Sequence, residues 1–268
     1  MNALCQMTGL DRSGFYRWRR RPADTPVAME LRDQMQRVAL AWPSYGYRRI
    51  TAALRQRGFE VNHKRVLRML REDNLLCVRR RGFVVTTDSR HNLAVYPNLA
   101  RGMVLNSPNQ LWVADITYIR LRTEFIYLAV VLDAYSRRVI GWALGRTLEA
   151  GLAVAALRMA LAGRGPVPGL VHHSDRGVQY ASAAYTSLLL EHAVQISMSR
   201  KGNPYDNARA ESFMKTLKAE EVYRNEYRDF NEARASIGDF LERVYNRERL
   251  HSALGYLPPA AFEDEAAS

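Results

Sequence analysis

The sequence predicts an α/β fold preceded by an all-α region. Two observations carry this expectation. Up to residue 84, apolar residues recur at helical spacing between Gly and Pro punctuation. Beyond residue 106, three apolar runs of strand length follow one another before any helical pattern begins. The 268 residues are enough for one large domain and a small one, so we divide the chain at this change of pattern.

The first 84 residues are expected to form helix-turn-helix units. Residues 1–25 hold two short helical patterns around Gly9, the second of them basic, which is a partial helix-turn-helix. Residues 26–84 predict a helix-turn-helix DNA-binding region with helices at 27–42, 47–56 and 63–74. Gly58 should end the second helix and Asn62 should cap the third. The expected inward-facing residues are Ile50, Ala53, Leu54, Val66, Leu67 and Leu70.

The outward face of helix 63–74 is basic, and two interpretations of it stay open. The face could be an ordinary solvated side of a helical hairpin, or it could lie against DNA. For DNA, the candidate phosphate contacts are Arg48, Arg49, Lys64, Arg65 and Arg68. Base contacts would come from the start of this helix. Residues 85–106 are expected to be a linker.

Residues 107–268 are expected to form the α/β domain. Strands are predicted at 111–121, 124–133 and 138–144, and their short connections indicate an antiparallel meander. A helix at 148–162, a strand at 169–173, a helix at 183–192, a strand at 194–197 and helices at 207–222 and 230–245 follow. This is the element order of an RNase H-like catalytic core, here with a C-terminal helical extension.

The charge of the chain is concentrated at one end. The formal net charge is +12; residues 1–81 hold 18 Lys+Arg against 7 Asp+Glu, whereas the remaining residues hold 21 against 20. Charge that served only solubility would be spread along the chain, so this distribution favours a polyanionic partner, most simply DNA.

Cysteine usage and hydropathy bear on the compartment. Cys5 and Cys77 have no motif spacing, so neither a disulfide framework nor a zinc site is expected. No signal-peptide apolar segment opens the chain, and the longest apolar run, 125–132, is too short to span a bilayer. We expect a cytoplasmic, nucleoid-associated protein with no membrane partner.

Three acids carry the chemistry that the sequence suggests. Asp115 lies in WVADIT and Asp175 in HHSDRG, each closing an apolar stretch that predicts a strand, and Glu211 lies in the helical segment NARAESF. Carboxylates brought together from two strand ends and a helix can hold hard divalent cations. Two Mg²⁺ ions roughly 3.5–4 Å apart activate the attacking oxygen and stabilise the leaving oxygen in phosphodiester transfer.

We therefore expect Asp115, Asp175 and Glu211 to be both the catalytic and the metal-binding residues. Asp115 is expected to bridge two Mg²⁺ ions per active site, with Asp175 and Glu211 each completing one coordination shell. Mn²⁺ is the expected substitute.

Several neighbouring residues have a plain and a functional interpretation. Lys215 and Lys218 share a helical face with Glu211, so they either form surface salt bridges or hold DNA phosphates beside the metals. Asp206 or Asn207 is expected to cap the helix. The structural interpretation is favoured for the other candidates: Asp133 as a turn acceptor, His172 and His173 as strand-end packing or support of the site, and Trp112 as core.

The segments around the three acids resemble the catalytic core of the retroviral-integrase-type DDE transposases of bacterial insertion sequences. The closest resemblance is to the insertion-sequence-three family, specifically its second-reading-frame (OrfB) product. YGYRRI at 45–50 with VNHKRV at 61–66 resembles the helix-turn-helix segment of that family. DAYSRRVIGW at 133–142 resembles its second and third strands, and residues 245–258 resemble its C-terminal signature.

The resemblance implies an RNase H-like fold and Mg²⁺-dependent strand cleavage and strand transfer at insertion-sequence ends. It assigns Asp115, Asp175 and Glu211 as the catalytic triad, and it implies a homo-oligomer acting on paired element ends and target DNA. An upstream reading frame usually supplies a leucine zipper in this family. This sequence has no heptad segment, so the upstream product is a candidate partner.

Two alternatives stay open from the sequence. One is an RNase H-like nuclease that cuts without joining, and the other is a catalytically silent DNA-binding regulator. Loss of one of the three acids would have favoured the regulator, and all three are present.

Overall fold

The fold is described from a computed structural model, which covers residues 26–77, 94–166, 168–200 and 204–267. These residues form two compact units, a helical unit up to residue 77 and an α/β unit from residue 94, and each is described by itself. The partial helix-turn-helix expected at 1–25 and residues 85–93 of the linker expected at 85–106 lie outside the described residues. No helix among the described residues combines the length and the apolar character needed to cross a bilayer.

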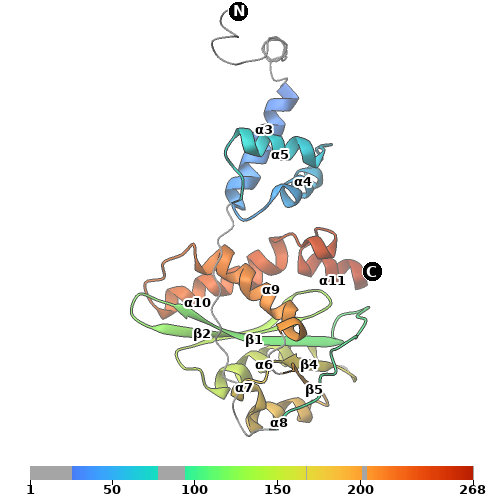
Figure 1. The fold of residues 1–268 in the computed structure, drawn as a ribbon, viewed down its shortest axis with the longest axis vertical. Coiled ribbons are helices and arrows are strands. Elements are labelled where there is room, and N and C mark those ends of the chain that lie inside the picture. The colour runs from blue at the N-terminus through green and yellow to red at the C-terminus, as the bar shows by residue number, and fades with distance from the viewer. Residues whose placement is uncertain (1–25, 78–93, 167, 201–203, 268) are drawn as a thin grey trace, which may run out of the picture. The chain divides into compact units, whose positions relative to one another are not determined.

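The helical unit consists of α3 (Pro26–Ala41), α4 (Tyr47–Gln56) and α5 (His63–Glu72). Its helices match the three predicted ones to within two residues at each end, and Figure 1 shows α3 packed beside the α4–α5 pair. The unit has its own small core, in which apolar side chains from all three helices are at most 4% exposed: Leu31, Met35, Val38, Ile50, Leu54, Val66 and Leu70. Burial of these side chains is what holds such short helices together, because isolated helices of this length are marginal in water.

The turn between α4 and α5 forms as predicted. Gly58 adopts φ +87°, a conformation that side chains disfavour, and ends α4. The Asn62 side chain accepts a hydrogen bond of 2.9 Å from the backbone N–H of Lys64, which caps α5. Two inward-facing assignments were wrong: Ala53 and Leu67 are only half-buried, whereas Thr51 and Met69 are buried. Leu67 is displaced because the buried stripe runs through residues 66, 69 and 70.

The α/β unit is built on one five-stranded sheet with the order β3-β2-β1-β4-β5. The strands are β1 (Leu111–Arg120), β2 (Phe125–Asp133), β3 (Val139–Gly145), β4 (Val171–Ser174) and β5 (Gln195–Met198). β1, β2 and β3 form the predicted antiparallel meander, and β4 and β5 add to β1 in parallel. The sheet order and the strand directions are those expected of an RNase H-like core.

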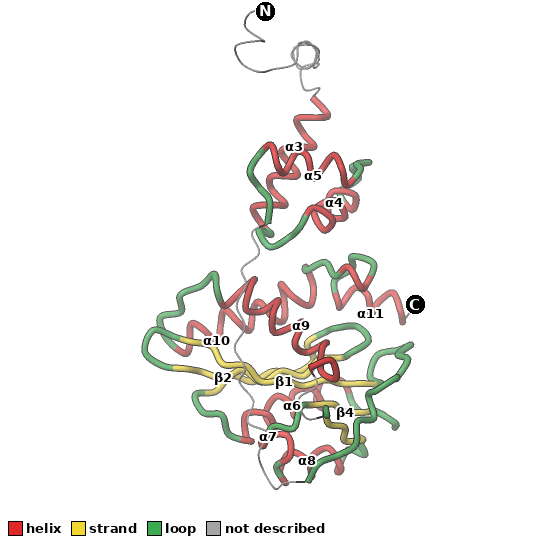
Figure 2. The backbone as a smooth tube through the Cα atoms, in the orientation of Figure 1, coloured by secondary structure: helices red, strands yellow, loops and turns green. Residues whose placement is uncertain are grey.

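Helices cover both faces of the sheet (Figures 1 and 2). α6 (Ala150–Arg164), α7 (Val178–Ala181) and α8 (Ala183–Glu191) cover one face, over the side chains of Trp112 and Ala114. α6 approaches β3 closely at Gly141, where an added Cβ would clash with the backbone oxygen of Ala156. A glycine is therefore required for this helix–strand contact.

The other face of the sheet is covered by the C-terminal helices. These are α9 (Ala208–Leu217), α10 (Phe230–Asp239) and two π-helical segments that continue them, η2 (Lys218–Val222) and η3 (Phe240–Glu248). Their buried residues pack on Val113 and Ile119 of β1. The helices predicted at 207–222 and 230–245 therefore exist, but each changes to the wider π-helical winding partway along, which periodicity could not indicate.

Two short α-helices of the described residues were missed by the sequence analysis, as were the 3-10 turns η1 (Pro204–Asn207) and η4 (Ser252–Leu254). α7 follows directly after the Asp175 segment, and α11 (Pro259–Ala267) closes the described chain. α11 is held by Glu263, which accepts hydrogen bonds from Ser136 Oγ at 2.6 Å, Arg138 Nη1 at 2.7 Å and Arg164 Nη2 at 2.7 Å. α7 has only four residues, which are too few to show the apolar periodicity of a helix, so the sequence carries no signal for it.

Candidate active site

Asp115 lies in the middle of β1, opposite Val130 of β2. The prediction that it ends a strand was therefore wrong. What ends beside it is the neighbouring strand: β4 pairs with β1 only at residues 111–113, while β1 continues to Arg120. Asp115 has the strand parity of Val113 and Ile119, so it faces the α9 side of the sheet.

Asp175 is placed abreast of Asp115 by the parallel register. The last paired residues are Val113 and His173, so two residues farther along each chain come Asp115 and Asp175. Neighbouring strands are about 4.8 Å apart. The prediction that Asp175 follows the end of a strand is confirmed, because β4 ends at Ser174.

The turn after Asp175 holds its carboxylate. Asp175 Oδ1 accepts the backbone N–H of Gly177 at 2.8 Å. A Cβ on Gly177 would come to 2.9 Å from that oxygen and 3.6 Å from Cδ2 of Tyr180, so only glycine leaves the carboxylate its place. The segment HHSDRG therefore contains a glycine, Gly177, that the position of the Asp175 carboxylate requires.

Glu211 comes from α9, the helix that covers the same face of the sheet. Its carboxylate is 34% exposed and lies 3.9 Å from Lys215 Nζ, so in this structure Glu211 is paired along its own helix. The helix itself is anchored to β1, since Asn207 Nδ2 donates to the backbone oxygen of Ala114 at 3.0 Å.

The prediction that the side chain of Asp206 or Asn207 caps this helix was wrong. Asn207 stands at the N-cap position but its side chain accepts no helix N–H, and its buried Oδ1 has no hydrogen-bond partner in the structure. Asp206 instead accepts from the backbone N–H of Arg200 at 2.9 Å and from its Nε at 3.1 Å. Tertiary contacts thus replaced the local cap.

The acids influence one another's ionisation. Burial, the nearby charge of Asp175 and, as a smaller effect, the charge of Glu211 together raise the pKa of Asp115 from 3.8 to about 7. The Ile116 N–H, which donates to Asp115 Oδ1 at 2.9 Å, and the charge of Lys218 act in the opposite direction. Asp115 therefore holds its proton up to a higher pH than an ordinary aspartate, because burial and the neighbouring acids disfavour its charge.

Lys218 is a cation whose charge lowers the pKa of Asp115. Its Nζ lies 4.8 Å from the centroid of the Tyr118 ring, in a cation–π contact. Burial lowers the pKa of Lys218, and Asp115 partly offsets this. Lys215, in contrast, has a side chain that is 67% exposed. The contribution of Tyr118 was missed by the sequence analysis, because no local pattern links β1 with the far end of α9.

The donor set suits a hard divalent cation. Carboxylate oxygens are the ligands that Mg²⁺ prefers, and two buried polar atoms without hydrogen-bond partners, Asn207 Oδ1 and Tyr180 OH, belong to residues beside Asp115 and Asp175. Within the described residues, no three His, Cys, Asp or Glu side chains are already gathered closely enough to hold a metal ion. Glu211, turned toward Lys215, is the acid that would have to move.

The neighbouring candidates have the structural roles that were favoured. His173 bonds Ser197 Oγ at 2.8 Å and Ser199 Oγ at 3.0 Å, and His172 bonds the Tyr185 hydroxyl at 2.9 Å. Burial lowers the pKa of both histidines, to about 3 for His172.

Asp133 and Trp112 are likewise structural. Asp133 accepts the backbone N–H groups of Asn109, Tyr135 and Ser136, so it is a turn acceptor. Trp112 is fully buried in the core.

The helical unit presents a basic surface. Arg48, Lys64, Arg65 and Arg68 are exposed, as predicted for the outward faces of α4 and α5. Arg49 differs: it is half-buried, with its guanidinium 5.5 Å from the centroid of the Tyr45 ring. Arg49 is therefore tied into the unit, whereas the other four cations are accessible from solvent.

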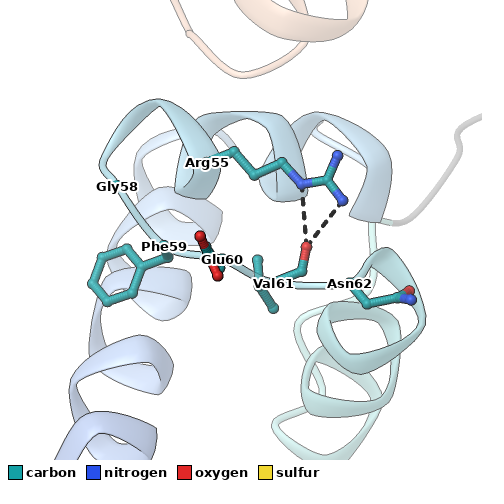
Figure 3. Close-up of a pocket in the computed structure, with 6 residues that line it drawn as sticks. All are labelled: Arg55, Gly58, Phe59, Glu60, Val61 and Asn62. Atoms are coloured by element: carbon teal, nitrogen blue, oxygen red, sulfur yellow. Dashed lines mark hydrogen bonds between the residues drawn. The ribbon is translucent and has the colours of Figure 1, made fainter.

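The turn between α4 and α5 borders a hollow of about 580 Å³, shown with its lining residues in Figure 3. Arg55 crosses this turn and donates from Nε and Nη2 to the backbone oxygen of Val61, both at 3.1 Å. The two hydrogen bonds fix the approach to Asn62 and hence the start of α5, the helix end from which base contacts were predicted.

Comparison with known proteins identifies both units. Residues 106–204 and 192–259 match two families described as "Integrase core domain", and residues 26–83 match an "HTH-like domain". The chain is 39% identical to the insertion element IS600 uncharacterized 31 kDa protein of Shigella sonnei, over 98% of both chains. It is 38% identical to the transposase InsF for insertion sequence IS3A of Escherichia coli strain K12, over 99% of this chain and 94% of that protein.

The fold is also found in a solved structure. The simian T-cell lymphotropic virus intasome, in complex with PP2A regulatory subunit B56 gamma, contains a chain that matches 82% of this one with a TM-score of 0.51. The match covers 70% of that chain at 16% sequence identity, which is a likeness of fold alone.

Proposed function

The chain belongs to the insertion-sequence transposases related to IS3, which carry an integrase core, and from this premise we propose that Asp115, Asp175 and Glu211 are the residues with which it cleaves and joins DNA strands. The protein is a DDE-type DNA transposase, and DNA is its partner. The observation that carries the residue assignment is the register that sets Asp115 abreast of Asp175 under the helix that bears Glu211.

We propose Mg²⁺ as the cofactor, two ions per site, with Mn²⁺ as its substitute. Asp115 would bridge both ions, and Asp175 and Glu211 would each complete one coordination shell. When bound, the ions supply the activation of the attacking water or 3′-hydroxyl and the stabilisation of the leaving oxygen. The countercharge that they bring explains why this chain tolerates a partly buried aspartate whose pKa is about 7.

The side chains around the acids have separate tasks in this proposal. Glu211 leaves Lys215, at 3.9 Å, to join the other two acids, which frees Lys215 for a DNA phosphate. Lys218, held over the Tyr118 ring, provides a second cation for the strand that enters the site. Lys215 is exposed, so its ammonium group can extend into solvent toward a phosphate. Lys218 is half-buried against Tyr118, so its ammonium group is held in one place.

The helical unit would hold DNA outside the active site. We propose residues 26–84 as the DNA-binding region, 85–106 as the linker and 107–268 as the catalytic core with its C-terminal extension. Phosphate contacts are proposed for Arg48, Arg49, Lys64, Arg65 and Arg68, with Arg49 the weakest candidate because it is half-buried whereas the other four are exposed.

Assembly and location remain part of the proposal. We propose that the protein acts as a homo-oligomer on paired element ends, with the upstream-reading-frame product as a further partner, and that it is associated with the nucleoid. A nuclease without joining activity and a catalytically silent regulator are the less favoured functions, because relatives 38% identical over almost the whole chain are named transposases.

The test is strand cleavage and joining with Mg²⁺ on DNA that carries the element's own ends. Wild type, Glu211→Gln and Glu226→Gln would be compared, with the upstream product supplied both in trans and as a fusion. Glu226 is the matched control, because its side chain is 86% exposed in the same unit.

Joined products from wild type and Glu226→Gln, with none from Glu211→Gln, would support the proposal. Cleavage without joining in every combination would indicate a nuclease. Activity of Glu211→Gln equal to that of wild type would remove Glu211 from the site.

A further inference from the structure

The hydroxyl of Tyr180 is a buried polar group that the proposed chemistry does not use. Tyr180 lies on α7, its residue is 3% exposed, and its hydroxyl has no hydrogen-bond partner in the structure. Buried polar groups are nearly always hydrogen-bonded, because leaving one unpaired forfeits the bonds it would make with water. An unpaired hydroxyl at this place therefore requires a reason.

The neighbouring Tyr185 has an equally buried hydroxyl that does form a hydrogen bond. Tyr185 is 1% exposed, and its ring centroid lies 5.3 Å from that of Tyr180. Its hydroxyl bonds His172 Nε2 at 2.9 Å. Both rings pack in the apolar cluster on the α6–α8 face of the sheet. Packing in this cluster therefore does not by itself prevent a tyrosine hydroxyl from forming a hydrogen bond.

Tyr180 is built into the turn that holds Asp175. The backbone of Gly177 donates to Asp175 Oδ1 at 2.8 Å and accepts the N–H of Tyr180 at 3.0 Å. A Cβ on Gly177 would lie within 4 Å of both Asp175 Oδ1 and Tyr180 Cδ2, so the carboxylate and the ring edge flank the same small space.

Both aspartates of the site act on this tyrosine. Burial raises the pKa of Tyr180 well above 10, and the charges of Tyr185, Asp115 and Asp175, in that order, raise it further. The phenol consequently stays protonated at physiological pH and can only serve as a hydroxyl donor or acceptor. Toward an ionised carboxylate, which accepts and does not donate, a protonated phenol can only donate.

We propose that Tyr180 is a positioning residue of the metal site, whose hydroxyl donates a hydrogen bond to the Asp115–Asp175 carboxylate pair when both are ionised around a bound divalent cation. The bond is made directly or through one water. The inference rests on the proposed function, because it takes these two acids as metal ligands. Carboxylate ligands are themselves hydrogen-bonded in metal sites, and loss of such a partner typically weakens metal binding about 10–100-fold.

The experiment measures Mn²⁺ affinity of the full chain by electron paramagnetic resonance of the free ion. Tyr180→Phe should weaken Mn²⁺ binding by about 10-fold or more. Tyr185→Phe is the matched control, because it removes an equally buried hydroxyl from the adjacent ring, and it should bind Mn²⁺ like wild type. Asp115→Asn should lose the site.

Thermal unfolding without metal separates positioning from folding. Tyr180→Phe should melt at or above the wild-type temperature, because the hydroxyl it removes has no partner in the metal-free protein. Tyr185→Phe should melt lower, since His172 loses its hydrogen bond.

Three results would overturn the inference. Wild-type Mn²⁺ affinity in Tyr180→Phe, with binding lost in Asp115→Asn, would remove Tyr180 and leave the proposed function intact. Weaker binding accompanied by a lower melting temperature in both tyrosine variants would make the role one of folding. Wild-type affinity in Asp115→Asn would overturn the proposed metal site itself, and the inference with it.

Discussion

Replacing Asp115 with asparagine should remove a pH dependence of stability that the metal-free wild-type protein has. The pKa of Asp115 is 3.8 in the unfolded chain and about 7 in the folded one, because burial and Asp175 disfavour the charge. Below pH 3.8 both states hold the proton. As the pH rises from there to about 7, the unfolded state ionises first, so stability falls, and above 7 the loss is complete.

The size of the effect follows from the shift. One pKa unit corresponds to about 1.4 kcal/mol, so a shift of about three units costs about 4 kcal/mol in full. Between about pH 5 and about pH 8, the share lost is about 2–3 kcal/mol, because part of the titration lies below pH 5. Asp115→Asn lacks this titrating carboxyl. Between about pH 5 and about pH 8, its free energy of unfolding should therefore fall by about 2–3 kcal/mol less than that of wild type.

The assay is urea unfolding of both proteins at the two pH values, with a chelator present. The variant serves as the control for every other titrating group. Added Mg²⁺ at about pH 8 should then stabilise the wild type and leave the variant unchanged, since bound ligand stabilises only a protein that has the site. Equal pH dependence of wild type and variant would refute the burial argument for Asp115.

Three further outcomes are expected. Arg65→Ala should weaken DNA binding across sequences and reduce the slope of log affinity against log salt by about 1, measured by fluorescence anisotropy; an unchanged slope would exclude Arg65 from the phosphate contacts. Gly141→Ala should lower the free energy of unfolding by about 1–3 kcal/mol, because its Cβ meets the Ala156 backbone; equal melting curves would contradict that contact. Glu220→Gln should cost about 3–5 kcal/mol in urea unfolding, because it leaves Arg249 buried without its carboxylate at 2.8 Å; a cost within measurement error would refute it.

The sequence by itself determined most of the helices and strands and the class of protein to which this chain belongs. The helix at 47–56 and the strand that starts at Leu111 were predicted at their observed starts. Apolar periodicity and the Gly or Asn residues that end or cap helices are local properties of the sequence. The outward basic residues of α5 were confirmed for the same reason. The three acids were predicted from their segments, and membership of the transposases is confirmed by relatives 38–39% identical over almost the whole chain.

Only the tertiary structure decided how Asp115 and Asp175 come to lie abreast. Asp115 was expected at a strand end, but it is β4 that ends, and the pairing of Val113 with His173 sets Asp115 abreast of Asp175. That register pairs residues 60 positions apart in the chain, and no local pattern encodes it.

The same holds for the side chains that surround the acids. Asn207 was expected to cap its helix and instead donates to Ala114, and Lys218 lies over Tyr118. The unpaired hydroxyl of Tyr180 is likewise invisible in the sequence. Hydrogen bonding and burial depend on which atoms the packed core brings within a few ångströms of one another, and this is fixed only when the sheet and the helices on its two faces have come together.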